Sequence, residues 1–152
     1  MRCTAALLLA LFAALCGGPG PAHAQAPVTD PYGNYRGVWR GDFLFTPGEA
    51  VNQPPAAART HEGSFEIAAD GAVRGVLGVS GCTLAGTSST FVSAANATLD
   101  VGLTGCRDAR FNGRYAGRLI NNPSLRYASL RLARLTGATT EGGAQVSAIV
   151  RR

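Results

Sequence analysis

The sequence predicts an all-β fold, and within that class an eight-stranded antiparallel up-and-down barrel. Beyond residue 34, apolar and polar residues alternate with a period of two, which is typical of strands that bury one face. Clusters of Gly, Pro, Asn, Asp and Ser separate these alternating runs, as turns do. No segment beyond the first 24 residues keeps a period of 3.6, so we expect little or no helix.

Eight runs are expected to be strands that direct one face into the core. They cover residues 35–45, 61–69, 72–79, 82–87, 97–103, 110–120, 125–135 and 144–150. The alternation predicts core positions that include Tyr35, Trp39, Phe43, Phe45, Phe65, Ile67, Val73, Leu77, Val79, Phe111, Tyr115, Leu119, Ala128, Leu130, Leu132, Val146, Ala148 and Val150. Trp39, the single tryptophan, is interpreted either as core packing or as a residue that stacks on a bound ligand.

The connections between the runs are expected to be turns, with one exception. Asp70-Gly71 predicts a two-residue hairpin turn of type I′, and Ser80-Gly81, Asn121-Asn122-Pro123 and residues 137–143 predict further turns. Residues 46–60 contain Pro47, Pro54 and Pro55, which cannot donate to a strand ladder, so we expect a long loop there. Loops of this length are uncommon in small domains and are often functional.

A meander of eight short strands tends to curl into a barrel. Closure removes the unpaired strand edges that otherwise promote aggregation. A barrel of eight strands is just wide enough to be filled by side chains or to hold one small ligand. A two-sheet β-sandwich is the alternative architecture.

The first 24 residues have the features of a cleaved signal peptide. Arg2 precedes the apolar residues 5–15, and Ala22-His23-Ala24 fits a small-residue cleavage site, so we expect cleavage before Gln25. A retained membrane anchor is the alternative, but the apolar run is shorter than the ~20 residues a spanning helix needs, and no later run approaches that length. We therefore expect an exported protein, periplasmic or extracellular and not membrane-spanning. A flexible leader (25–34) and a single domain (35–152) follow.

Cys82 and Cys106 are the two cysteines that remain after this cleavage. In an oxidising compartment they are expected to form one disulfide, with two free thiols as the alternative. If they face each other in an antiparallel strand pair, the numbers of opposed residues sum to 188, which places Gly86 opposite Gly102.

All basic side chains other than histidine are arginines, and they are spread along the chain. Cleavage would remove one arginine and no acidic residue, which lowers the formal net charge from +5 to +4. Nucleic-acid binding is not expected, because its usual mark is a basic run or stripe. Outward positions such as Arg114, Arg118 and Arg131 disfavour a transmembrane barrel, in which each arginine would cost about 2–4 kcal/mol at the bilayer midplane.

The sequence shows no motif for catalysis or for a cofactor. His61 is the only histidine after residue 24, and no G-x-S-x-G motif accompanies it. One histidine with scattered carboxylates does not provide a metal-binding pattern, so we expect neither metal nor cofactor. A hydrolase would require His61 to meet a nucleophile in a cleft.

Three segments of the chain resemble parts of known proteins. They are Gly81-Cys82-Thr83-Leu84-Ala85-Gly86, then Gly105-Cys106-Arg107-Asp108, then Phe111-Asn112-Gly113-Arg114-Tyr115-Ala116-Gly117. Together they are similar to small exported bacterial β-barrel proteins of the calycin-like kind, which include periplasmic protease inhibitors and lysozyme inhibitors. The resemblance implies a barrel with a binding role, and it transfers no site residue to this chain.

The expected function is that of an exported, non-enzymatic binding protein. It would engage a protein partner, through its long loop or leader, or a small apolar ligand inside the barrel. Alternatives are a structural component of the bacterial envelope and a hydrolase that uses His61. The candidate contact residues are Trp39, Tyr35, Tyr115, Pro47, Pro54 and Pro55.

Overall fold

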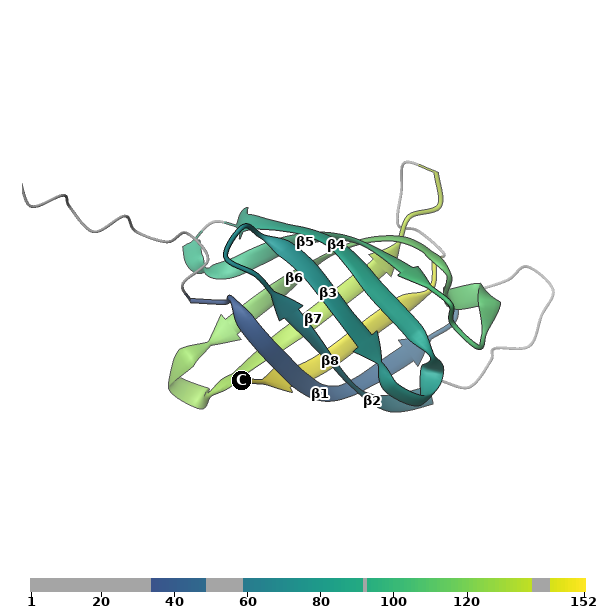
Figure 1. The fold of residues 1–152 in the computed structure, drawn as a ribbon, viewed down its shortest axis with the longest axis horizontal. Coiled ribbons are helices and arrows are strands. Elements are labelled where there is room, and N and C mark those ends of the chain that lie inside the picture. The colour runs from purple at the N-terminus through teal and green to yellow at the C-terminus, as the bar shows by residue number, and fades with distance from the viewer. Residues whose placement is uncertain (1–33, 49–58, 92, 138–142) are drawn as a thin grey trace, which may run out of the picture.

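The computed structural model describes residues 34–48, 59–91, 93–137 and 143–152. Within them lie eight strands and three short 3-10 turns (Figure 1). The strands are β1 (Gly37–Thr46), β2 (Arg59–Ile67), β3 (Ala72–Leu77), β4 (Cys82–Phe91), β5 (Ser93–Thr104), β6 (Gly113–Asn122), β7 (Tyr127–Arg134) and β8 (Gln145–Arg151). The 3-10 turns are η1 (Gly78–Ser80), η2 (Ala109–Phe111) and η3 (Pro123–Leu125).

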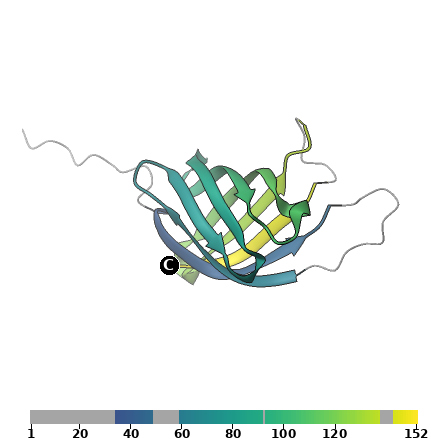
Figure 2. The same ribbon diagram turned by 45° about the vertical axis from the view of Figure 1, so that its right-hand side comes forward.

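The eight strands form one closed antiparallel barrel in sequence order. Each strand pairs with the next, and β1 also pairs with β8, from Arg40 opposite Arg151 to Thr46 opposite Gln145. In two views the front strands cross obliquely over those behind, as in a tilted barrel (Figures 1 and 2). The predicted barrel is therefore confirmed, and the sandwich alternative is wrong. The signal peptide and nearly all of the leader lie outside the described residues.

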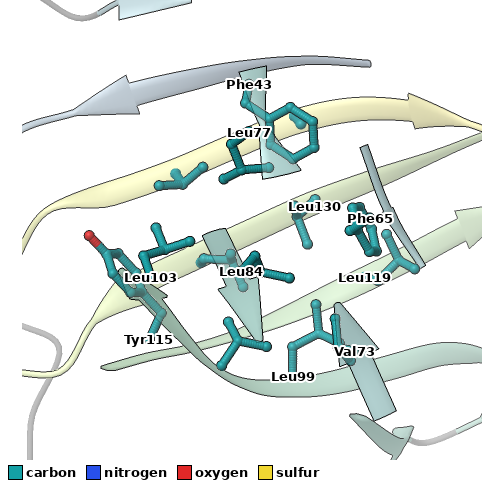
Figure 3. Packing of buried hydrophobic residues seen from close by; sticks show 14 of the residues in the cluster. Phe43, Phe65, Val73, Leu77, Leu84, Leu99, Leu103, Tyr115, Leu119 and Leu130 are labelled. Atoms are coloured by element: carbon teal, nitrogen blue, oxygen red, sulfur yellow. The ribbon is translucent and has the colours of Figure 1, made fainter. Parts of the chain in front are cut away.

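Apolar side chains from all eight strands meet inside the barrel and form one core. Figure 3 shows Phe43, Phe65, Leu99 and Leu130 directed toward one another from strands on opposite sides. Phe43 and Phe65 pack edge to face, with ring centroids 6.3 Å apart. This core occupies the space in which an enclosed ligand would lie, and its burial is the main source of stability.

The barrel has two different ends. At the Trp39 end, defined by Trp39, Tyr35 and Arg152, the Trp39 indole is 1% exposed and its Nε1 donates to the Tyr35 carbonyl at 2.8 Å. The Tyr35 hydroxyl lies 3.1 Å from Thr90 Oγ1, and the Arg152 guanidinium lies 5.1 Å from the centre of the Trp39 ring. These contacts cover the end of the core from which β1 begins.

The opposite end, the disulfide end, is where η1 and η2 lie, on the right of Figure 1. The Cys82–Cys106 disulfide predicted from the sequence is present there, with Cα atoms 4.1 Å apart. The predicted register is wrong by one residue, since Gly86 lies opposite Val101 and Ala85 opposite Gly102. The cause is Gly105, whose φ of 68° turns the chain after β5, so that Cys106 reaches Cys82 from outside the strand ladder.

Several boundaries also differ from the predicted ones. Val79 was expected in the core, but β3 ends at Leu77 and η1 leaves Val79 63% exposed, because Gly78 adopts a φ of 47°. Residues 110–111 belong to η2 rather than to a strand, and residue 125 belongs to η3. β4 and β5 extend further toward each other than expected, to Phe91 and from Ser93.

A hairpin at Asp70-Gly71 is confirmed, but the two-residue type I′ turn is wrong, because Ala68 lies opposite Ala72 and three residues connect them. Only Gly71 has a positive φ, 84°, whereas a type I′ turn needs positive φ at both central residues. The turn is closed by Gly71 N donating to Ala68 O at 3.0 Å, and Asp70 Oδ1 accepts from Ala72 N at 2.9 Å. The carboxylate thus replaces a backbone acceptor in the turn.

Candidate partner-binding pocket at the disulfide end

A pocket of about 230 Å³ opens at the disulfide end of the barrel. It lies where β1 ends and β2 begins, against η1 and the segment that leads into η2. Its lining consists of Phe45, Arg59, His61, Val79, Ser80, Cys82, Cys106, Arg107, Asp108 and Phe111. Residues from four separate parts of the chain therefore build it, and closure of the barrel brings them together.

The floor of the pocket is aromatic. Phe45 and Phe111 are almost fully buried and pack edge to face with ring centroids 5.0 Å apart. The His61 ring lies 5.7 Å from the Phe45 ring, and the disulfide contributes sulfur to the same wall. An apolar group that entered would exchange water for these surfaces.

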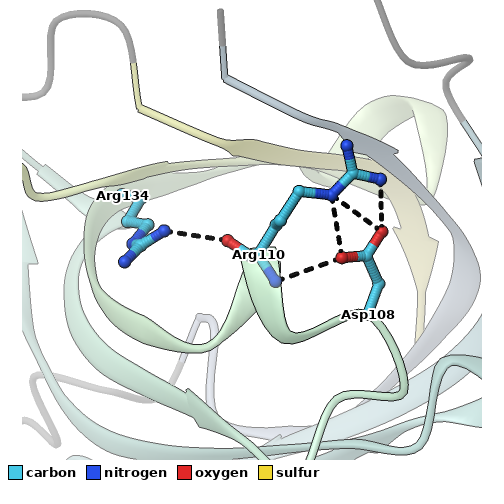
Figure 4. A network of polar contacts seen from close by, with 3 residues as sticks. All are labelled: Asp108, Arg110 and Arg134. Atoms are coloured by element: carbon cyan, nitrogen blue, oxygen red, sulfur yellow. Dashed lines mark hydrogen bonds and ion pairs between the residues drawn. The ribbon is translucent and has the colours of Figure 1, made fainter. Parts of the chain in front are cut away.

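The rim of the pocket is basic. Arg59 and Arg107 are exposed, and their side chains form no hydrogen bond or ion pair with any part of the chain that the structure describes. Asp108 is the one carboxylate in the lining. It accepts hydrogen bonds from Arg110 Nη2 at 2.7 Å and from Arg110 Nε at 3.0 Å (Figure 4). Arg134 Nη1 donates to the Arg110 carbonyl at 2.9 Å, which places a fourth guanidinium beside the pocket. The positive charge at this rim therefore exceeds the negative.

The Asp108–Arg110 pair stays ionised. The Arg110 side-chain hydrogen bond, opposed by a smaller desolvation effect, holds the pKa of Asp108 below its usual value, and the charge of Arg59 contributes to the lowering. The hydrogen bond from Asp108 raises the pKa of Arg110 in turn. Because Arg110 is exposed and Asp108 only half-buried, we assign the pair no more than a small stabilising role.

Local hydrogen bonds fix the shape of the segment that forms one wall. Asp108 precedes η2, and its Oδ1 accepts from Arg110 N at 3.1 Å, as a capping side chain does. Asn112 Oδ1 accepts from Cys106 N at 3.0 Å, and the Tyr115 hydroxyl donates to the Phe111 carbonyl at 2.8 Å. The wall is therefore held in place by hydrogen bonds within the protein.

The buried Tyr115 hydroxyl gives a test of this arrangement. Desolvation raises the pKa of Tyr115 to about 12 from 10.0, an effect that nearby Arg134 partly offsets. The raised pKa means that the folded state favours the neutral phenol. The stabilisation that Tyr115 contributes is therefore complete below pH 10 and is lost as the pH rises through about 12. We expect difference absorption to show a tyrosine that ionises near pH 12 and that is missing from Tyr115→Phe. Ionisation of that tyrosine near pH 10 would contradict the buried hydrogen bond to Phe111.

The candidate contact residues do not lie together. Tyr35 and Trp39 are buried at the Trp39 end, where their polar atoms bond within the protein. Tyr115 is buried beneath the wall of the pocket at the disulfide end. Pro47 is half-buried just after β1, and Pro54 and Pro55 lie outside the described residues.

The pocket also brings together a serine, a histidine and a carboxylate. Ser80, His61 and Asp108 all line it, but no hydrogen bond connects His61 with either of the others in the described structure. Ser80 Oγ bonds to the Leu77 carbonyl, and Asp108 is engaged by Arg110. The described residues also include no group of three or more His, Cys, Asp or Glu side chains that could hold a metal ion.

The larger hollows lie on the outer wall and are more open. One of them, about 930 Å³, runs over β5 to β8, and its lining includes Arg118 and Arg131. These arginines are opposite each other across β6 and β7, and Arg118 lies over the Phe91 ring at 4.0 Å. This hollow is more open to solvent than the pocket at the disulfide end, although its lining includes the apolar side chains of Ile120, Leu132 and Val146.

Comparisons with known proteins add no assignment. No protein-family model matches the chain, and no curated protein is significantly similar to it. In the parts of the chain that the structure describes, no helix has the length and apolar character to cross a membrane.

Sequence reasoning named His61, Cys82 and Cys106 but did not predict a site at the other seven lining residues, namely Phe45, Arg59, Val79, Ser80, Arg107, Asp108 and Phe111. Arg59 was assigned to the long loop, Arg107 follows a cysteine without any motif, and Val79 was assigned to the core. Gly78, Gly81 and Gly105 were the available signal, since clustered glycines beside a disulfide indicate chain reversals at one end of the barrel.

Proposed function

We propose that this chain is an exported, non-enzymatic binding protein that recognises a protein partner through its disulfide end. The observation that supports this most is the contrast between the filled interior and the pocket at the rim. A pocket of about 230 Å³ is smaller than the roughly 300–1,000 Å³ of sites that hold drug-sized ligands. It suits a single side chain of a larger partner.

A small apolar ligand inside the barrel is the weaker version of this proposal. Lipid-binding barrels of eight strands keep an internal cavity, whereas here Trp39, Phe43, Phe65, Tyr115 and their aliphatic neighbours occupy the centre. Binding there would require several of these side chains to move, and each one displaced would lose its packing.

Export is supported by the disulfide and by the sequence of the first 24 residues. Disulfides persist in oxidising compartments such as the periplasm, and Cys82–Cys106 is largely buried within the fold. The closed eight-stranded architecture is also shared by calycin-like barrels, which supports the resemblance seen in the sequence.

Two other functions receive less support. A hydrolase would use His61 with Ser80 and Asp108, but both potential partners of the histidine are bonded elsewhere. A structural envelope component would act through the outer wall, and it would give no reason for exposed Val79 and unpaired arginines around one pocket.

A matched pair of surface substitutions tests the proposal. Val79 is 63% exposed at the disulfide end and Leu125 is 62% exposed in η3 at the Trp39 end. We expect Val79→Ser to reduce capture of the partner from envelope extract about tenfold, because interface anchors typically contribute more than 1 kcal/mol. Leu125→Ser should capture it as well as the unaltered protein does. Equal losses from both variants, or none from either, would place the interface elsewhere.

Replacing residues 47–58 with a short Gly-Ser linker tests, in the same capture assay, whether the long loop contributes to partner binding in addition to the barrel. Phe45 and Arg59 are paired in the β1–β2 ladder, so a short linker can close this hairpin without disturbing the sheet. We expect the shortened protein to fold, with unchanged Trp39 fluorescence, and to lose capture of the partner. Retained capture would assign recognition to the pocket without the loop.

A further inference from the structure

We propose that the pocket at the disulfide end binds the carboxyl-terminal residue of the partner polypeptide. The apolar side chain of that residue would contact Phe45 and Phe111, and its α-carboxylate would meet the guanidinium groups of Arg59 and Arg107. This inference rests on the proposed function and names the chemistry of the partner.

The floor requires an apolar group. Phe45 and Phe111 present aromatic surface, Val79 adds an exposed aliphatic side chain at the edge, and the disulfide closes one side. A charged or polar group placed against this floor would lose its hydration without gaining a hydrogen bond. The floor therefore selects an aromatic or branched aliphatic side chain.

The rim requires an anion. Among the described residues, the lining contains two guanidinium groups (Arg59 and Arg107) and one carboxylate (Asp108). Arg110 is paired with that carboxylate, and Arg134 bonds to the Arg110 carbonyl. Arg110 is already held by Asp108 and Arg134 by a carbonyl, whereas the side chains of Arg59 and Arg107 have no such bond within the described structure. Planar guanidinium groups pair best with planar carboxylates, to which they can donate two hydrogen bonds.

A chain terminus meets both requirements with one residue. Its side chain and its carboxylate leave the same Cα atom, so a side chain on the floor places the carboxylate at the rim. An internal Asp or Glu supplies the carboxylate without the apolar group, and an internal apolar residue brings a neutral peptide in place of the charge. The size of the pocket, about 230 Å³, also admits one residue and not a long segment.

Asp108 has a role opposite to that of the arginines. Its carboxylate lies in the lining and close enough to Arg59 to feel its charge, so it competes with an incoming anion for the same cations. Asn at this position keeps a capping oxygen for η2 and removes the charge. Neutralising a surface acid should thus strengthen binding, which a purely structural role for Asp108 would not produce.

Three small probes test the inference by NMR titration of the folded, disulfide-bonded protein. N-acetylphenylalanine carries both groups, N-acetylphenylalaninamide lacks the carboxylate, and N-acetylaspartylphenylalaninamide moves the carboxylate to a neighbouring side chain. We expect N-acetylphenylalanine to bind with a millimolar dissociation constant, shifting amides of residues 105–112, and about three- to fivefold more tightly than either of the other two. Equal affinity for the acid and its amide, or tighter binding of the aspartyl probe, would overturn the inference.

Variants assign the charge effect to residues. Arg59→Gln and Arg107→Gln should each weaken binding of N-acetylphenylalanine to about the affinity of N-acetylphenylalaninamide. Asp108→Asn should tighten binding of N-acetylphenylalanine about twofold. None of the three variants should change the affinity for N-acetylphenylalaninamide. Arg74→Gln, on the outer wall of β3, is the matched control and should change nothing. If Arg59→Gln and Arg107→Gln left both probes unaffected while Val79→Ser still reduced partner capture, the proposed function would stand and this inference would fail.

Discussion

Removing the disulfide by the double substitution Cys82→Ala and Cys106→Ala is expected to destabilise the barrel by about 3–4 kcal/mol. The bond closes a loop with a sequence separation of 24 residues, which contains β4, its hairpin and β5. In the chain-entropy model, opening a loop of this length gives the unfolded chain back that amount of conformational freedom. A single domain of this size is typically stable by only about 5–15 kcal/mol, so the loss would be a large part of the total.

Denaturant unfolding of the oxidised protein and of the double variant measures this difference. The unaltered protein, unfolded in the presence of a thiol reductant, is the control and should match the double variant within about 1 kcal/mol, because alanine removes little else at these two positions. We also expect the backbone amides of residues 105–112 to lose hydrogen-exchange protection first in the variant, since Cys106 anchors that segment to β4. A loss below about 1 kcal/mol would mean that the unfolded chain is compact enough to keep the loop closed without the bond.

The core could be predicted from the sequence because each strand buries only one face. Under that condition, alternation alone assigns side chains such as Trp39, Leu130 and Val146 to the interior, whatever the long-range pairing is. Strand order also followed from short connections, since sequential antiparallel strands usually lie side by side. Closure followed from the cost of leaving edges unpaired.

The pocket could not be predicted, because its geometry depends on backbone reversals at glycines. Glycine adopts positive and negative φ with similar ease, so the sequence did not indicate that Gly78 would end β3 and expose Val79. In the same way Gly105 turns the chain after β5, so that Cys106 reaches Cys82 from outside the ladder and the register differs by one residue from the predicted one. Arg59 and Arg107 line the same pocket only because of these reversals and of barrel closure, which no local pattern encodes.

The division between a filled barrel and a candidate binding site at its rim has a physical basis. The ladder hydrogen bonds and the core fix the strands, whereas the segment between β5 and β6 at the disulfide end is held by side-chain contacts such as that of Asn112 with Cys106 N. Changes at this rim can alter recognition with little effect on the core. Changes at the Trp39 end should instead lower the stability of the core with little effect on recognition, and substitutions of Trp39 test this.

Trp39→Ala is expected to cost about 3–5 kcal/mol, the range for truncation of a large buried aromatic residue. The indole is 1% exposed. Its Nε1 donates a hydrogen bond to the Tyr35 carbonyl, and the Arg152 guanidinium lies over its ring. Leu44→Ala, at a 38% exposed position on the same strand, is the matched control and should cost less than about 1 kcal/mol. Denaturant unfolding followed by circular dichroism measures both, because the alanine variant has no tryptophan fluorescence.

Trp39→Phe separates the loss of packing from the loss of the hydrogen bond. Phenylalanine keeps most of the apolar contact but leaves the Tyr35 carbonyl without the Nε1 donor, for which we expect a loss of about 1–3 kcal/mol. Since Trp39 lies at the opposite end from the pocket, the folded Trp39→Phe protein should bind N-acetylphenylalanine with unchanged affinity. A marked loss of that affinity would show that the two ends are coupled through the core, and the barrel could then no longer be treated as a passive scaffold for its rim.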